Sequence, residues 1–274
     1  MRFPRPTFLV FGVLGGVLLL SLVLPIVNLF VQADWAGWMK ALQERGAGDA
    51  LAVSALSSAI AVTIMTVLGV PLGYLLARGR FLFTQICIGL VFLPMVVPDL
   101  AGGILLLQTF GPHGTIGGPA AGVGFELTNN LAGIVLAQLF VSAPFVVVSA
   151  LAAFAGVDPK LEMAAATLGD SQWHVFWRIS VPLAWPGIAA GITLAWIRAL
   201  GEFGATLIVA YNPHTLPVYM WVKFESDGLT GALPVAFLLV LLAGAAVVIS
   251  TLLSRLSGYR DTAAVLGDTH GRPT

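Results

Sequence analysis

The chain has 274 residues, of which 58% are apolar and only 9% are charged. Soluble domains carry about 25% charged residues, so this composition excludes an ordinary soluble protein and favours a bilayer. The formal net charge is zero, which excludes the basic footprint of a nucleic-acid-binding protein, and the single cysteine, Cys87, excludes an intrachain disulfide.

Six apolar segments are long enough to cross about 30 Å of hydrocarbon as helices that rise about 1.5 Å per residue. They cover residues 7–31, 51–77, 83–108, 131–155, 186–210 and 232–256. The alternating pattern of a membrane barrel is missing from the sequence, so the predicted fold is an all-α integral membrane protein. We expect one transmembrane domain over residues 1–256, followed by a polar cytoplasmic tail over residues 257–274.

The first segment follows Arg2 and Arg5, as the apolar core of a signal peptide would. That core has about 7 to 15 apolar residues, and residues 7–31 exceed it. We therefore interpret this segment as an uncleaved span.

The basic residues predict the orientation of the chain. If the N-terminus is cytoplasmic, nine Lys and Arg residues fall in inner segments and three in outer loops, which agrees with the positive-inside rule. The inner residues are Arg2, Arg5, Arg78, Arg80, Lys160, Arg178, Arg255, Arg260 and Arg272, and the outer ones are Lys40, Arg45 and Lys223. Both termini are then expected to be cytoplasmic.

Prolines interrupt several of the segments. Pro94 and Pro98 remove two backbone hydrogen bonds from the third segment, and Pro144 and Pro186 lie in the fourth and fifth. These helices should bend at the prolines. Such bends suit a gate, and packing alone is the alternative explanation for each of them.

The longest polar connection, residues 157–182, lies between the fourth and fifth segments. Asp158 can cap a helix that Pro159 opens, since proline at the first helical position loses only an amide that has no partner there. One short helix over Leu161–Leu168 follows, and Gly169 can end it in a left-handed turn.

A second short helix is predicted after Asp170 or Ser171, either of which can cap it. Its aromatic side chains are Trp173, Phe176 and Trp177. Pro182 is expected to stop this helix before the chain re-enters the membrane. The pair of helices suits a docking element for another protein, or equally a hairpin that lies on lipid headgroups.

Charged residues also occur at membrane depth. Arg198 and Glu202 are neighbours on one helix face, and each would cost about 3 kcal/mol if it faced lipid alone at the bilayer centre. They should therefore face protein or water, either as a structural ion pair or on an anion path. The Asp99 carboxylate should either be paired with a cation or be exposed to water, and Arg198 is its candidate partner across the bundle. These three residues are the candidates for a translocation path or gate.

The connection also carries a family motif. Glu162-x-Ala164-Ala165-x-x-Leu168-Gly169, followed by Ile179-x-Val181-Pro182, resembles the EAA loop of the permease subunits of bacterial ATP-binding-cassette importers. The resemblance implies coupling helices that sit in a cleft of a cytoplasmic ATPase. The residues assigned to this coupling are Glu162, Ala164, Ala165, Gly169 and Trp173. One extra residue separates the glutamate from the glycine compared with the commonest spacing, and Val181 stands where leucine is usual.

Three further runs extend the resemblance over about residues 50 to 255. They are Leu93-Pro94-x-x-x-Pro98, Phe140-Val141-Ser142-x-Pro144 and Arg198-Ala199-Leu200-Gly201-Glu202-Phe203-Gly204-Ala205. All three are similar to molybdate, tungstate and sulfate permeases. The last run, followed by Val209-Ala210-Tyr211-x-Pro213, looks closer to the molybdate and tungstate branch than to the sulfate branch.

The resemblance implies an oxyanion importer in a bacterial or archaeal cell membrane. Its expected partners are ATPase subunits, an extracytoplasmic oxyanion-binding protein and a second copy of the permease in a homodimer. A sulfate permease in a heterodimer is the alternative.

The chain is not expected to be an enzyme. The phosphate-binding motif G-x-x-x-x-G-K-[ST] is missing, so ATP and Mg²⁺ should be bound by the partner ATPase. The four histidines, His113, His174, His214 and His270, are scattered, and no cofactor or metal is expected in this chain. A secondary carrier is a further alternative, and it would transport without any ATPase.

Overall fold

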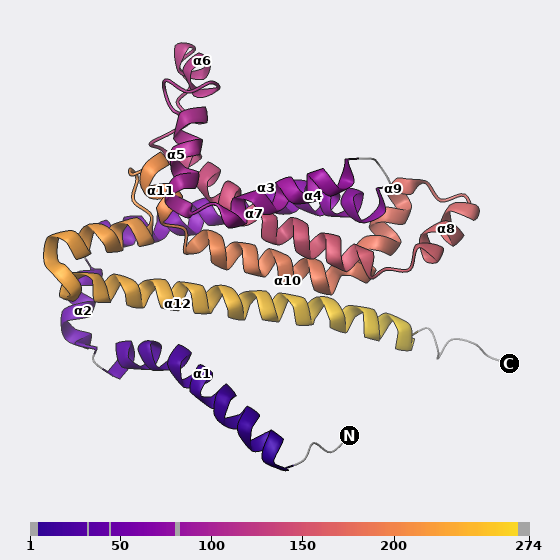
Figure 1. Ribbon diagram of the computed structural model, residues 1–274, viewed down its shortest axis with the longest axis horizontal. Helices are drawn as coiled ribbons and strands as arrows, with labels where there is room; N and C mark the ends of the chain where they lie inside the picture. Colours follow the sequence, from indigo (N-terminus) through magenta and orange to yellow (C-terminus); the bar gives the residue numbers. More distant parts are fainter. Residues whose placement is uncertain (1–4, 32, 44, 80–82, 268–274) are drawn as a thin grey trace.

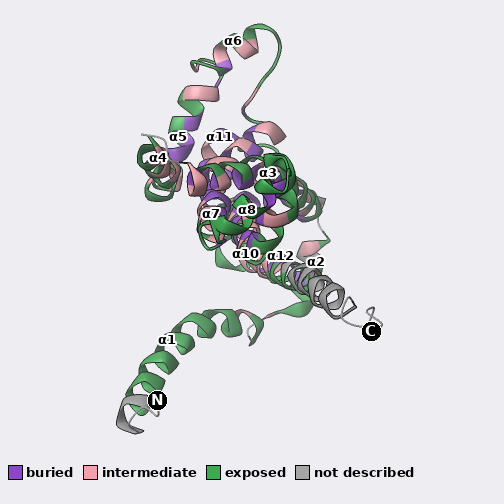
Figure 2. Ribbon diagram, turned by 90° about the vertical axis from the view of Figure 1, so that its right-hand side faces the viewer, coloured by how far each residue is buried: buried purple, intermediate pink, exposed green. Residues whose placement is uncertain are grey.

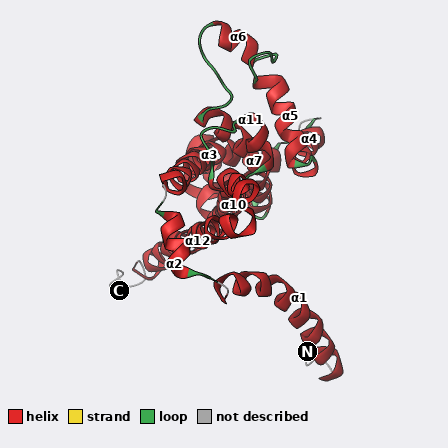
Figure 3. Ribbon diagram, turned by 90° about the vertical axis from the view of Figure 1, so that its left-hand side faces the viewer, coloured by secondary structure: helices red, strands yellow, loops and turns green. Residues whose placement is uncertain are grey.

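The structure is a computed structural model that describes residues 5–31, 33–43, 45–79 and 83–267. These residues form helices joined by turns and loops, with no strand among them (Figure 3). In chain order the helices are α1 (Arg5–Val31), α2 (Trp35–Leu42), α3 (Arg45–Arg78), α4 (Thr84–Val96), α5 (Asp99–Phe110), α6 (Gly117–Gly122), α7 (Leu131–Ala155), α8 (Pro159–Thr167), α9 (Gln172–Val175), the π-helical turn η1 (Phe176–Ser180), α10 (Val181–Leu200), α11 (Gly204–Val209) and α12 (Leu216–Gly267).

Five described helices are long and apolar enough to cross a membrane: α1, α3, α7, α12 and the continuous stretch from α9 to α10. The pair α4 and α5 would make a sixth crossing if it counted as one span. The all-helical membrane fold expected from the sequence is therefore confirmed, with five to six candidate spans.

The centre of the bundle is α3 packed along α7, with α10 and α12 beside them (Figure 1). Close approach of α3 and α7 depends on small residues, as is usual between membrane helices. A Cβ atom on Gly73 would lie 2.6 Å from the Ala150 Cβ and 2.9 Å from the backbone nitrogen of Leu151. The core beside this contact contains the fully buried side chains of Met65 and Phe154.

Helix α1 stands apart from this bundle (Figures 1 and 2). Its described side chains, which begin at Leu9, are almost all exposed and apolar. The end of α1 meets the bundle through Phe30, whose ring packs 5.3 Å from that of Phe237 in α12. Trp35 and Trp38 of α2 pack on the same Phe237 ring.

The third expected helix, residues 83–108, is not continuous. Helix α4 ends at Val96, Val97 and Pro98 are extended, and α5 leaves at 113° to α4. The residue before a proline is disfavoured from helical geometry, so Pro98 breaks the helix, while Pro94 stays inside α4. Helix α5 therefore leaves the direction of α4 and packs against α11 and α7, and α6 lies beyond its far end (Figure 1).

The fifth expected helix, residues 186–210, also has different bounds. Pro182 was expected to end the short helix before it, but the structure shows no end there. The π-turn η1 leads directly into α10, and the amide of Val181 bonds the carbonyl of Phe176, five residues back. Such a turn shifts the hydrogen-bond register, which lets a proline follow without the clash expected in an α-helix. Helix α10 then ends at Leu200 rather than at residue 210, and α11 is separate.

The last helix begins earlier and continues further than expected. Helix α12 starts at Leu216, inside an expected loop, and is interrupted at Gly228, which has φ 67°. It continues to Gly267, within the expected polar tail, and residues 268–274 lie outside the described part of the chain.

Gly73→Val tests the α3–α7 contact. The new side chain would meet backbone atoms of α7, and overpacking of this kind typically costs about 1–3 kcal/mol. We expect a clear drop in the melting temperature of the purified protein. Gly89→Val in α4 is the control, because a Cβ there meets nothing within 4 Å. Equal melting temperatures for the two variants would contradict the tight contact.

Candidate functional site

In the connection between α7 and α10, the first helix with its cap and the turn that ends it form as the sequence predicts. The Asp158 carboxylate accepts the amide of Lys160 at 2.9 Å and caps α8, which Pro159 opens. Gly169 has φ 98°, the left-handed turn that ends this helix. The hydroxyl of Ser171, rather than Asp170, caps α9 by accepting the amide of His174 at 3.3 Å.

Glu162 of α8 points back into the bundle. Its two carboxylate oxygens accept hydrogen bonds from Nε and Nη2 of Arg78 at 2.9 and 3.0 Å. The hydroxyl of Ser180 donates to the same carboxylate at 2.7 Å, and Arg78 Nη2 also donates to the carbonyl of Val157 at 2.8 Å. We call these four residues the Arg78 cluster.

The Arg78 cluster joins four helical segments at one end of the bundle. Arg78 is the last residue of α3, Val157 follows α7, Glu162 lies in α8 and Ser180 precedes α10. The side chains of Arg78 and Glu162 are only 19% and 13% exposed, and bidentate pairs of this type are strong and directional. The short helix α8 is thereby fixed to the ends of the long helices.

The contacts of Glu162 with Arg78 and Ser180 were not predicted from the sequence. Arg78 was interpreted only as one of the inner positive charges, and the 84 residues between it and Glu162 hide the contact. The signal that was available is the position of a basic residue at the end of an apolar segment, next to the predicted loop.

The other residues assigned to coupling divide between two faces of the loop. Ala165 is buried, whereas Ala164, Gly169 and Trp173 are exposed, with Trp173 at 68%. Large apolar side chains accompany them on the surface, namely Leu161, Met163 and Leu168. The loop therefore presents an exposed apolar surface on α8 itself and on the turn that follows it.

Aromatic rings pack the loop against α3. The Phe176 ring lies 4.9 Å from that of Tyr74, and Trp177 packs edge-on to both Trp173 and Phe176. A hollow of about 390 Å³ opens between these rings and Leu75 of α3. This aromatic contact holds η1 against α3 in addition to the hydrogen bonds of the Arg78 cluster.

A second charged group lies near the other end of α10. Arg198 donates to both oxygens of Asp99 at 2.7 Å and to Glu202 at 3.0 Å. The other Glu202 oxygen accepts the amide of Ala205 at 2.7 Å. We call Asp99, Arg198, Glu202 and the Ala205 amide the Arg198 cluster. The contact between Asp99 and Arg198 expected from the sequence is confirmed.

The two carboxylates of the Arg198 cluster differ in burial. The Glu202 side chain is fully buried, whereas that of Asp99 is 42% exposed and that of Arg198 is 28% exposed. With two carboxylates and one guanidinium, the cluster carries no excess positive charge. An anion approaching Arg198 therefore meets a guanidinium whose charge is already balanced.

A buried polar layer supports the end of α10 at this level. The Gln138 amide group of α7 donates to the carbonyl of Ala199 and to the hydroxyl of Ser57, both at 3.1 Å. The hydroxyl of Ser54 accepts the amide of Leu216 at 2.7 Å. These bonds tie α3, α7, α10 and α12 together beside Arg198.

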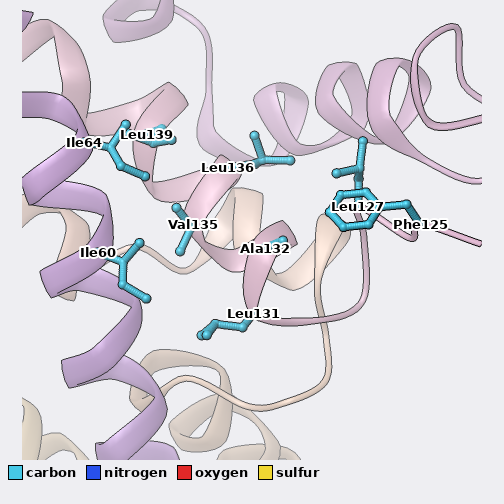
Figure 4. Close-up of a pocket in the computed structure, with 9 residues that line it drawn as sticks. All are labelled: Ile60, Ile64, Phe125, Leu127, Leu131, Ala132, Val135, Leu136 and Leu139. Carbon is cyan, nitrogen blue, oxygen red and sulfur yellow. The ribbon is translucent and has the colours of Figure 1, made fainter. Parts of the chain in front are cut away.

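A hollow of about 380 Å³ lies between α3, α7 and the loop before α7 (Figure 4). Its nine lining residues are all apolar: Ile60, Ile64, Phe125, Leu127, Leu131, Ala132, Val135, Leu136 and Leu139. Burying a charge without hydrogen-bond donors is prohibitively costly, so this hollow does not suit an anion.

Residues 69–262 match the family described as binding-protein-dependent transport system inner membrane component. A probable molybdenum ABC transporter permease protein of Haloferax volcanii is 44% identical over 241 residues, which are 86% of this chain and 86% of that one. A molybdate/tungstate transport system permease protein of Thermococcus kodakarensis is 38% identical over 86% of this chain and 92% of its own. A sulfate transport system permease protein of Synechocystis is 28% identical, over 88% and 90% of the two chains.

The fold is also similar to that of solved structures. A chain in the crystal structure of a bacterial ABC transporter involved in the import of the acidic polysaccharide alginate superposes with a TM-score of 0.67. The match covers 93% of this chain and 96% of that one at 17% identity, so it shows the fold alone.

Glu162→Gln tests the Arg78 cluster. Hydrogen bonds to charged groups contribute about 1.5–3 kcal/mol, so their weakening should speed amide exchange in α8 by about tenfold or more while α7 stays protected. Hydrogen exchange with mass spectrometry measures this. Glu225→Gln, at an exposed glutamate of α12, is the matched control. Unchanged exchange in α8 would show that the ion pair does not hold it.

Proposed function

The chain belongs to the family of binding-protein-dependent transport system inner membrane components, and from this membership we propose that it is the membrane-spanning subunit of an ATP-driven importer for molybdate or tungstate. The observation that carries the proposal is the 44% identity over 86% of the chain to a permease named for molybdenum. The sulfate permease is a weaker match at 28% identity, which makes sulfate the second candidate substrate.

The proposed topology has six crossings with the α8 loop and both termini in the cytoplasm. Arg78 and Val157 meet, so α3 and α7 end on the same side of the bundle, and the chain between them must return across the membrane. Helix α4 begins on that side and accounts for the return. Figure 1 draws the N-terminal start of α1 and the C-terminal end of α12 toward the same side as α8, which agrees with the excess of basic residues expected there.

The proposed coupling surface is the exposed part of the loop around α8. Ala164, Gly169 and Trp173 would contact the ATPase subunit, and Ala165 would support the helix from within. Glu162 would act through Arg78, because the ion pair fixes α8 rigidly to the bundle. A displacement of α8 would then be transmitted to α3 and α7 and, through Ser180, to α10. ATP and Mg²⁺ would be bound by the ATPase alone.

A second copy of this chain is the proposed partner within the membrane. The apolar side chains of α1 are exposed in the single chain, and α1 reaches well beyond the bundle (Figure 2). Pairing about a two-fold axis would cover such surface and enclose a central path. A heterodimer with a different permease is the alternative that accompanies the sulfate assignment. The remaining partner is an extracytoplasmic oxyanion-binding protein.

The Arg198 cluster is the proposed path or gate. It lies about 25 Å along α10 from the loop end, since 17 residues at about 1.5 Å each separate Val181 from Arg198. With the loop in the cytoplasm, Asp99, Arg198 and Glu202 would lie toward the outer surface. Asp99 and Arg198 are part-exposed there, and this supports their contact with a passing ion.

Reconstitution tests the proposed function. We expect proteoliposomes that contain this chain, its ATPase and its binding protein to take up labelled molybdate only when ATP is inside with the ATPase. Tungstate should compete at equal concentration and sulfate only in large excess. Uptake by the chain alone would instead identify a secondary carrier, and a preference for sulfate would overturn the molybdate assignment.

Gly169→Val tests the coupling surface. A β-branched residue is strained at φ 98°, so the turn between α8 and α9 should change shape while the bundle still inserts. We expect ATP hydrolysis to continue and the number of anions taken up per ATP to fall by about tenfold or more.

Gly156→Val is the matched control, because Gly156 has φ −78° at the end of α7 and a Cβ there makes only ordinary contacts. Its uptake per ATP should stay near that of the unmodified complex. Equal uptake per ATP in the two variants would count against a docking role for the turn.

A further inference from the structure

Resting on the proposed function, we propose that Arg198 is an oxyanion-binding subsite which the Asp99 carboxylate occupies at rest, and that the passing anion displaces Asp99 from it. Glu202 stays bound to Arg198 throughout. Asp99 is then a built-in competitor of the substrate.

The carboxylates of Asp99 and Glu202 are bound by different numbers of groups, and this is the first support. Glu202 is fully buried and its two oxygens are bound by different groups, Arg198 Nη1 and the Ala205 amide. Both Asp99 oxygens instead share the single Nη2 of Arg198, each at 2.7 Å, and the Asp99 side chain is 42% exposed. Asp99 would stay part-exposed on release, whereas release of Glu202 would leave a buried charge. Asp99 is therefore the exchangeable partner.

The second support is the chemistry of the guanidinium. Arginine N–H groups donate to the oxygens of carboxylates and of tetrahedral oxyanions alike, so the Nη2 group that Asp99 occupies could donate to an oxyanion instead. An anion that replaces Asp99 would thus restore the hydrogen bonds of Arg198 without a change in its position. No covalent step is involved, since one ion pair breaks as another forms.

The third support is the place of Asp99 in the backbone. Asp99 is the first residue of α5, directly after the extended Val97 and Pro98, so it does not belong to the same continuous helix as α4. Its neighbour is Gly204, where a Cβ would lie 2.8 Å from the Asp99 Cβ. This glycine lets Asp99 approach Arg198, and a small shift of α5 relative to α11 would withdraw it.

Glu202 has a separate consequence for the subsite. Because its carboxylate already neutralises part of Arg198, the guanidinium alone does not make a strong site for a dianion. A transport path requires binding that is favourable enough to admit the ion and weak enough to release it. The retained carboxylate therefore suits passage rather than storage.

The link to the loop gives a physical cause for the release of Asp99. Helix α10 carries Arg198 near one end, and Ser180, which donates to Glu162, directly precedes its other end. Movement of α8 is thus transmitted along a continuous helix to Arg198, while Asp99 is anchored on α5. Relative motion of α10 and α5 would open the Asp99–Arg198 pair.

Asp99→Asn tests the competition. The assembled complex of permease and ATPase in nanodiscs is incubated with labelled molybdate in the absence of the binding protein. We expect the variant to bind molybdate at least about tenfold more tightly than the unmodified complex, because the competing carboxylate is gone. Asp99→Asn combined with Arg198→Gln should lose this gain. Asp227→Asn, which removes an exposed carboxylate of α12 outside the cluster, should bind as the unmodified complex does.

Equal binding by Asp99→Asn and the unmodified complex would overturn the proposal, as would a gain that persists in the double variant. The unmodified complex supplies a second measurement that does not depend on the folding of a variant. Carbodiimide labelling of Asp99, read by mass spectrometry, should rise when molybdate is added and not when chloride is added. Labelling that ignores molybdate would also overturn the proposal.

Different results would contradict the proposed importer function and the proposed exchange at Arg198. If the unmodified complex with its binding protein takes up no oxyanion, the proposed function is wrong. If uptake occurs but either molybdate binding to Asp99→Asn or labelling of Asp99 fails to change as expected, the importer stands and the exchange at Arg198 is wrong.

Discussion

A charge removed from water must meet another charge, and this constraint determines how α10 connects to the rest of the molecule. Near one end, Ser180 and the Arg78–Glu162 pair fix α10 to α3, α7 and α8. Near the other end, Arg198 bonds to Asp99 and Glu202. A chain with few charges thus places two of its ion-pair clusters at opposite ends of one helix.

Between these clusters the structure relies on shape. Glycines allow α3 to lie directly on α7, and the π-turn before α10 lets the helix continue through Pro182. A stretch from Gln172 to Leu200 therefore passes without a break from the loop to the Arg198 cluster. Continuous helices transmit displacement better than jointed ones, so this geometry agrees with the proposed drive from a partner ATPase.

The sequence predicted features that depend on local chemistry: the apolar segments, the cap at Asp158 and the left-handed Gly169. It also predicted the partner of Asp99, because a lone carboxylate in the membrane needs one. Features that depend on distant residues could not be predicted from the sequence. The Glu162 side chain points inward because it bonds to Arg78, which is far away in the chain. The predictions of a helix stop at Pro182 and of a loop before α12 were wrong for another reason. Hydrogen-bond register and packing outweighed the usual preference of proline and of polar residues for helix ends and loops.

The Arg78–Glu162 pair has a consequence for how related chains diverge. Either residue replaced alone would leave its partner charged and poorly hydrated, so single changes should be removed by selection while joint changes persist. Two positions 84 residues apart should then vary together. A chimaera that carries the α8 loop of a related permease would also need the matching residue at the end of α3. This limits which segments can be exchanged between such subunits.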